Sequence, residues 1–192
     1  MSTVNRSRFT VEEFVTQCQG ALGEGEPHLA IRDVLARTVN RPRFIEAGLG
    51  TRSSWCLETL HHAPDLTILH IVWPPGVDLF AHDHQMWAAI GIYGGVERNT
   101  YYRRNSDSLE VTGSRDAEAG DVLMLGSQAI HSVSNPTRQW TAALHVYGGD
   151  FFDEARTQWG SIDGPGEPFD AESTRAVLAA ADQRAKNYRH SL

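Results

Sequence analysis

The segment that decides the fold runs from Gly76 to Gly95 and reads GVDLFAHDHQMWAAIGIYGG. At its centre stands the triplet His82-Asp83-His84, which lies on a predicted strand. Alternate residues of a strand face the same way, so both imidazoles are expected on one side and Asp83 on the other. Two neutral imidazoles on one face are suited to bind a single metal ion.

A second segment supplies a further histidine at a regular distance from two glycines. It runs from Gly120 to Asn135 and reads GDVLMLGSQAIHSVSN, with His131 near its end. Five residues separate Gly120 from Gly126, and three separate His131 from Asn135. His131 is therefore a third candidate metal ligand beside His82 and His84.

The sequence around these segments is typical of an all-β protein. Short runs rich in β-branched and aromatic residues are separated by Gly, Pro, Asn and Asp, which favours a sandwich or barrel over βαβ units. These runs are Leu66 to Trp73, Ala88 to Tyr93, Val96 to Arg103, Asp121 to Leu125, Ile130 to Ser134 and Thr141 to Tyr147.

Both ends of the chain have helical patterns instead. Thr10 and Glu13 form a capping-box pattern ahead of a helix, and a second helix is expected after Pro27. Near the end, Ser173 to Tyr188 has helical composition. We therefore predict one domain over residues 1–192: a helical extension at 1–50, a β-barrel at 51–150, and a loop and helix at 151–192.

Composition excludes several classes of function. The 192 residues carry 17 Lys and Arg against 24 Asp and Glu, a net charge of −7, which argues against nucleic acid or an anionic membrane as a partner. No apolar run approaches the ~20 residues that span a bilayer. Two cysteines exclude a disulfide scaffold. Without an export signal, we expect a cytoplasmic protein.

The two segments resemble the paired motifs of the cupin superfamily. The first has the spacing G-x5-HxH-x3/4-E-x6-G, with Ala88 where many cupins place a Glu ligand. The second matches G-x5-PxG-x2-H-x3-N in spacing, with Gly126 in place of Pro and Gln128 in place of Gly. The resemblance implies a double-stranded β-helix barrel with the three histidines inside. Without the Glu, the ligand set is neutral, so a divalent ion keeps its charge for anionic substrate groups and O₂.

Within the superfamily, the chain is similar to cysteine dioxygenases and related thiol dioxygenases. These carry a Ser-x-His-x-Tyr strand, matched here by His145 and Tyr147 but with Ala143 in place of Ser. The resemblance implies a non-haem Fe(II) enzyme that oxidises a small thiol with O₂ to a sulfinate. Tyr147 would donate a hydrogen bond to the reacting groups, and His145 would orient its hydroxyl. A substrate carboxylate would be held by Arg52, whose guanidinium fork matches a carboxylate.

Other functions fit the same motifs. A three-histidine cupin dioxygenase acting on a diketone would need no carboxylate-binding Arg. A non-catalytic cupin that binds a small ligand, or a zinc hydrolase, would use the same imidazoles. Nitrogen ligands suit iron, zinc, copper and nickel, so ligand type does not decide the metal. A homo-oligomer is compatible with the sequence, although nothing in it specifies one.

Overall fold

The computed structural model describes residues 8–51 and 53–190, and begins with a layer of three helices. Their bounds are α1 (Val11–Leu22), α2 (Pro27–Val39) and α3 (Pro42–Leu49). The side chain of Thr10 caps α1 by accepting the backbone N–H of Glu13 at 3.3 Å, as the sequence pattern predicts. Helix α3 lies within the predicted helical extension but was not predicted as a separate helix, although Pro42 at its first turn is a helix-start signal.

The β-strands form two antiparallel sheets. The first has the order β1 (Cys56–Ala63), β2 (Leu66–Trp73), β9 (Thr141–Tyr147), β4 (Ala88–Gly94) and β7 (Val122–Leu125). The second has the order β11 (Glu167–Pro168), β10 (Thr157–Trp159), β3 (Asp78–Asp83), β8 (Ile130–Ser134), β5 (Val96–Arg104) and β6 (Leu109–Glu118).

The strand order identifies the architecture. Strands β2 to β9 divide into β2-β9-β4-β7 and β3-β8-β5-β6, so the chain passes repeatedly from one sheet to the other. This is the arrangement of a double-sheet jelly roll, to which the cupins belong. The prediction of a cupin double-stranded β-helix barrel with N-terminal helices and a C-terminal helix is confirmed.

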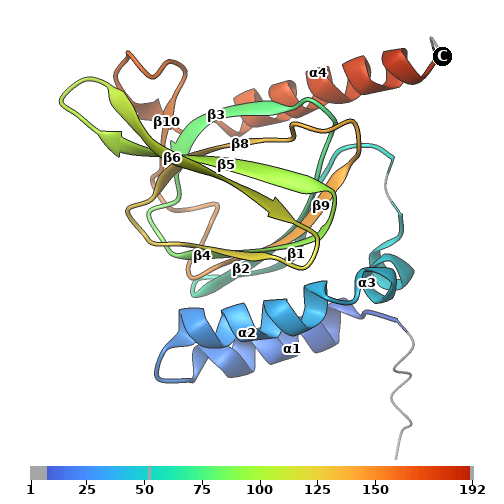
Figure 1. Ribbon diagram of the computed structural model, residues 1–192. Helices are drawn as coiled ribbons and strands as arrows, with labels where there is room; N and C mark the ends of the chain where they lie inside the picture. The colour runs from blue at the N-terminus through green and yellow to red at the C-terminus, as the bar shows by residue number, and fades with distance from the viewer. Residues whose placement is uncertain (1–7, 52, 191–192) are drawn as a thin grey trace, which may run out of the picture.

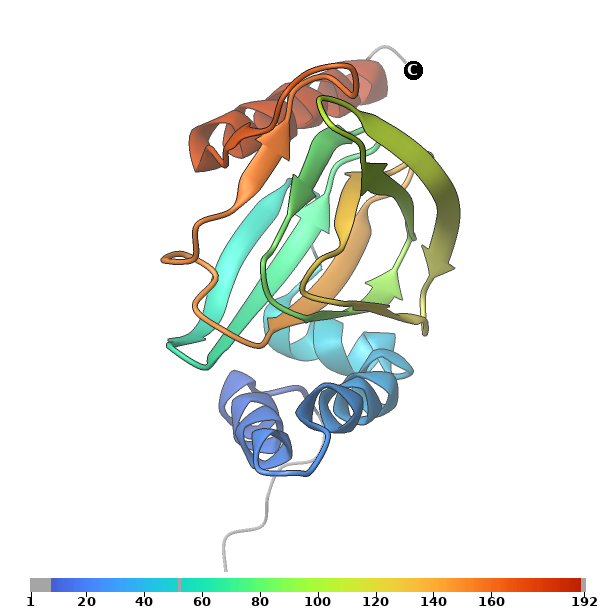
Figure 2. The same ribbon diagram turned by 90° about the vertical axis from the view of Figure 1, so that its left-hand side faces the viewer.

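The helices cover opposite sides of the barrel. Figures 1 and 2 show α1 and α2 beneath the sheet that contains β2 and β4, and α4 (Ala171–His190) across the far side near β3. All eight residues of β2 are buried, because one face packs on the helices and the other faces the barrel interior. A short apolar run without alternation is the pattern expected of a strand covered on both sides.

Two strands extend the barrel beyond the predicted boundary at residue 150. β10 pairs with β3, placing Gln158 opposite His82, and β11 pairs with β10. The residue pattern did not indicate these strands, because they are only three and two residues long. Strand β6 was also unexpected: most of its side chains are exposed, so no apolar alternation marks it. In the described part of the chain, no helix is long and apolar enough to cross a bilayer.

Candidate metal centre

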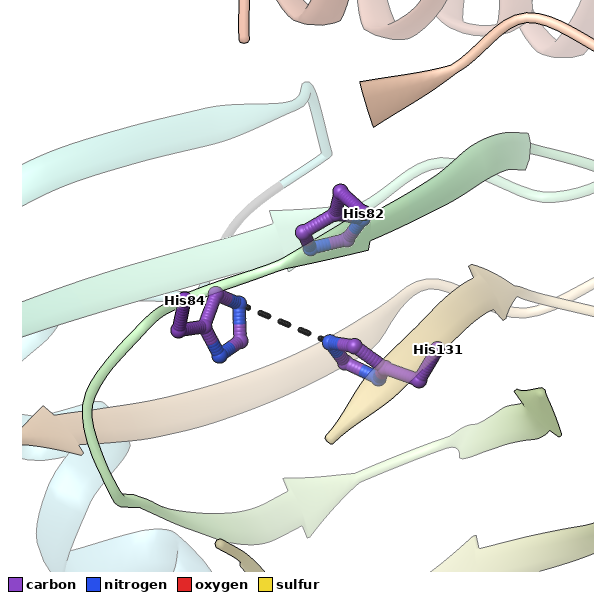
Figure 3. Close-up of side chains that lie close together, drawn as sticks. All are labelled: His82, His84 and His131. Atoms are coloured by element: carbon purple, nitrogen blue, oxygen red, sulfur yellow. Dashed lines mark hydrogen bonds between the residues drawn. The ribbon is translucent and has the colours of Figure 1, made fainter. Parts of the chain in front are cut away.

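Three histidines meet between the two sheets, close to the end of β3. His82 and His131 are direct cross-strand partners on β3 and β8, and His84 follows the last residue of β3. Figure 3 shows the three rings pointing toward one another. One nitrogen from each ring lies within 4.8 Å of the others, and the Nε2 atoms of His84 and His131 are 3.5 Å apart. Two ligands with bonds of about 2.0–2.1 Å to one ion lie at most about 4 Å apart, so this pair already has a suitable spacing.

A tight turn after β3 places His84 beside the strand ligands. Gln85 adopts a left-handed backbone with φ of 56°, and its side chain donates a hydrogen bond to Asp83 Oδ2 at 2.7 Å. Asp83 Oδ1 accepts the backbone N–H of Thr157 at 2.9 Å, which ties the strand to the start of β10. The carboxylate of Asp83 therefore stabilises this turn through hydrogen bonds, while the imidazoles of His82 and His84 face the interior.

Hydrogen bonds to the Nδ1 atoms orient two of the rings. His82 Nδ1 donates to the carbonyl of Phe80 at 3.1 Å, and His131 Nδ1 donates to Asn99 Oδ1 at 2.6 Å. Both acceptors are oxygens, so both Nδ1 atoms carry the proton and both Nε2 atoms keep a lone pair. Partners of this kind hold metal-binding histidines in the required tautomer.

Burial keeps the three rings neutral. Desolvation, assisted by the positive charge of Arg156, lowers the pKa of His82 to about 4, against the opposing effect of the hydrogen bond to Phe80. Burial and the neighbouring histidines hold the pKa values of His84 and His131 well below the ordinary value. Metal binding requires a neutral imidazole, so at neutral pH these ligands need not lose a proton.

The donor set fits a divalent first-row metal ion. Three nitrogens on one side leave positions open for substrate, which is typical of catalytic rather than structural sites. Ala88, at the position of the carboxylate ligand of many cupins, is fully buried in the apolar core and offers no donor. His82, His84 and His131 would hold the ion, and their nitrogens are compatible with iron, zinc, copper or nickel.

His145 and Tyr147 lie on the face of β9 that borders the histidine cluster. The His145 Nδ1 and Tyr147 hydroxyl are 3.1 Å apart, and the Tyr147 ring packs edge-on against His84 with centroids 5.0 Å apart. Burial raises the pKa of Tyr147 and lowers that of His145 to about 3, so both groups are neutral at neutral pH. Ala143, two residues earlier, provides no hydroxyl to extend the pair.

Arg52, the predicted carboxylate-binding residue, lies outside the described residues. A different arginine reaches the site. The guanidinium of Arg156 lies between the rings of Phe151 and Phe169, at 3.9 and 4.0 Å from their centroids. Its Nε and Nη1 atoms are buried, and neither has a hydrogen-bond partner among the described residues. No motif in the sequence marks Arg156, because the aromatic residues that hold it come from separate loops.

The three candidate metal ligands line one cavity of about 80 Å³, together with His145, Tyr147 and Arg156. This volume is small beside the roughly 300–1,000 Å³ of sites for drug-sized ligands. The rest of the wall is mostly apolar and includes Leu57, Ile71, Trp73, Leu79, Val133, Phe151, Phe152 and Phe169. The cavity therefore suits a small molecule with an apolar body and an anionic group.

Comparison with known proteins gives the following likenesses. No protein-family model matches the sequence. A protein of unknown function with a cupin-like fold from Ralstonia eutropha JMP134 has a TM-score of 0.46 and 17% identity, covering 69% of this chain and 75% of that one. An RmlC-like cupin with a double-stranded β-helix fold from Methanocaldococcus jannaschii has a TM-score of 0.44 and 15% identity, covering 53% and 85%. Oxalate decarboxylase from Bacillus subtilis has a TM-score of 0.41 and 20% identity, covering 50% and 24%.

These overlaps are partial, so the assignment of the fold rests on the strand order of this chain. Strand order and histidine cluster together define the class of protein. The chain has the cupin fold, with a candidate metal site of three histidines inside the barrel.

Proposed function

We propose that the protein is a non-haem Fe(II) dioxygenase that oxidises a small thiol bearing a carboxylate to the sulfinate. The observation that carries the proposal is the combination, in one small cavity, of three neutral imidazoles and a guanidinium with two unused donors. A neutral ligand set leaves the charge of the ion available to a thiolate, and the guanidinium matches the other end of such a molecule.

The reaction balances without a further reductant. A thiol RSH and O₂ give RSO₂H, with both oxygen atoms added to sulfur and the four electrons that O₂ accepts supplied by that sulfur. The ferrous ion would supply thiolate binding and O₂ activation. The chain supplies the remaining elements: an anion-binding group, a hydrogen-bond donor and walls that exclude water.

Arg156 would hold the carboxylate. The nearby Asp83 interacts with Arg156 electrostatically, while its two oxygens accept hydrogen bonds from Thr157 and Gln85. Stacking between two aromatic rings fixes the plane of the guanidinium, and charge-assisted bonds to a planar anion need that plane fixed. Arg156 thus takes the role that the sequence resemblance placed on Arg52.

Tyr147 would donate a hydrogen bond to the reacting groups, since its ring already packs on the ligand His84. His145 would orient the Tyr147 hydroxyl through the contact at 3.1 Å. The wall beside them is aromatic: the ring of Phe151 lies 4.4 Å from that of Tyr147, centroid to centroid. Excluding water strengthens the electrostatic interactions inside the site.

The proposal is tested by oxygen uptake after anaerobic reconstitution with Fe(II). We expect 3-mercaptopropionate or cysteine to consume one O₂ per thiol, and cysteamine, which lacks a carboxylate, to react much more slowly. Replacing Arg156 by Met should raise KM for the carboxylates roughly 10- to 100-fold, the value of one or two bonds to a charged group. Arg98→Met is the matched control, because Arg98 does not line this cavity and is paired with Asp116 at 2.7 Å.

Three results would contradict the proposal. Absence of uptake with every thiol would remove the activity, and uptake with acetylacetone alone would favour a diketone-cleaving enzyme. Equal KM values for Arg156→Met and Arg98→Met would remove the carboxylate assignment. Metal analysis of protein purified without added metal distinguishes iron from zinc and hence from a hydrolase.

A further inference from the structure

A buried chain of hydrogen bonds runs from β2 to the metal ligand on β8. Trp73 Nε1 donates to Glu97 Oε2 at 2.6 Å, Asn99 Nδ2 donates to Glu97 Oε1 at 2.9 Å, and His131 Nδ1 donates to Asn99 Oδ1 at 2.6 Å. Glu97 and Asn99 are fully buried, and Trp73 is only 4% exposed. Glu97 and Asn99 are two residues apart on β5, so both side chains point to the barrel interior.

When Glu97 is ionised, both of its oxygens accept, and the direction of every hydrogen bond in this series is fixed. An indole N–H donates and never accepts, so one Glu97 oxygen must accept. The other Glu97 oxygen accepts from the amide nitrogen of Asn99, which turns the Asn99 oxygen toward His131. An oxygen there requires the proton on His131 Nδ1 and leaves the lone pair on Nε2, where the metal would bind.

We propose that Glu97 is a positioning residue of the metal centre: by accepting two hydrogen bonds, it fixes the orientation of the Asn99 amide and thereby the metal-binding tautomer of His131. The inference rests on the metal centre of the proposed function and not on the oxidation of a thiol.

The two hydrogen bonds to Glu97 support this role. Burial of a carboxyl group without exposure to water is costly and raises the pKa of Glu97 to about 7, whereas the hydrogen bonds from Asn99 and Trp73 favour the ionised form that accepts at both oxygens. A purely structural partner for Trp73 would need one acceptor atom, whereas the chain described here uses two at once. Glu97 Oε2 also lies 3.8 Å from His145 Nε2, so the same group borders the histidine that contacts Tyr147.

Replacing Glu97 by Gln reverses the direction of the hydrogen bonds between residue 97, Asn99 and His131, while the side chain keeps its shape. Gln offers one acceptor and one donor, and Trp73 takes the acceptor. The amide nitrogen of the new Gln then donates to Asn99, so the Asn99 amide rotates to present its oxygen to the Gln. As a result, the N–H₂ group of Asn99 faces His131 Nδ1. His131 can then accept only at Nδ1, so its proton moves to Nε2 and blocks the ligand atom.

The experiment measures the tautomer of His131 in metal-free protein by ¹⁵N-histidine NMR, and Zn²⁺ affinity by competition with a chelator. We expect a proton on Nδ1 in the wild type and on Nε2 in Glu97→Gln, with Zn²⁺ affinity lowered about 10- to 100-fold, as for other lost partners of metal-binding histidines. The double variant Glu97→Gln/Asn99→Asp restores the acceptor facing His131, and should restore both tautomer and affinity. Glu110→Gln, on the exposed face of β6, is the control for loss of a carboxylate.

An unchanged tautomer in folded Glu97→Gln would overturn the inference, as would a double variant that fails to recover. If Glu97→Gln does not fold, the wild-type spectrum still decides: a proton on His131 Nε2 would overturn the inference. Neither measurement uses a thiol or O₂, so failure of the proposed oxidation would leave these results unaffected.

Discussion

The two faces of strand β9 contact different parts of the molecule: one packs on the helices and the other lines the cavity. Leu144 and Val146 point toward the helices α1 and α2, where they join a core made almost entirely of apolar side chains. His145 and Tyr147 alternate with them and point into the barrel, beside the candidate metal ligands. One seven-residue strand therefore contributes to both the stability of the helical layer and the chemistry of the cavity.

The difference between these faces lies in the partners of the buried groups. The helix-facing side chains need only close packing, which any apolar side chain of the right volume can supply. The cavity-facing side chains are polar and equally buried, so each requires a particular neighbour to offset the loss of water. We therefore expect changes on the first face to alter the free energy of unfolding, and changes on the second to alter metal binding and turnover.

The largest effect is expected on the cavity side, from His84→Ala. Loss of one of three ligands should lower metal affinity more than about 100-fold, beyond the effect of losing a supporting partner, and abolish turnover. His61→Ala is the comparison, because His61 lies on β1 of the same sheet but neither lines the cavity nor belongs to a group of potential metal ligands among the residues that the structure describes. Metal content after purification should fall for His84→Ala alone. Equal loss of metal in both variants would contradict the assignment of metal binding to the cavity-facing residues.

The next effect is expected on the helix side. Leu144 is fully buried, and Leu144→Ala should lower the free energy of unfolding by about 2–5 kcal/mol through lost burial and a residual cavity. Denaturant titration measures this change, while metal content and the KM of the folded protein should stay at wild-type values. A parallel fall in metal affinity would show that the two faces are coupled.

The smallest effect is expected from a single hydroxyl group. Tyr147→Phe should slow turnover roughly 3- to 10-fold, the value of one hydrogen bond, with no loss of metal. Tyr102→Phe is matched to it, since the Tyr102 hydroxyl bonds to Ser132 Oγ at 2.9 Å and lies in a different cluster of side chains. Steady-state oxygen uptake compares the two variants, and equal rates in both would remove Tyr147 from the reaction.

The candidate ligands were accessible to sequence reasoning because their spacing is local. His82 and His84 stand two residues apart beside a strand end, and His131 occupies a regular place after Gly120 and Gly126. Arg156 and Glu97 were not accessible in this way. Arg156 is marked only by Phe151 and Phe169, which surround it after folding, and Glu97 only by hydrogen bonds to Trp73 and Asn99.

The sequence by itself determined the β-barrel between two helical ends and the histidines suited to a metal ion. Alternation along strands, turn residues and helix caps act over a few residues, so they can be read without coordinates. Only the tertiary structure decided which arginine faces the cavity, which tautomer His131 adopts and how small the cavity is. These properties depend on atoms brought together from distant strands and loops, and on the removal of water that makes each buried polar group require a specific partner.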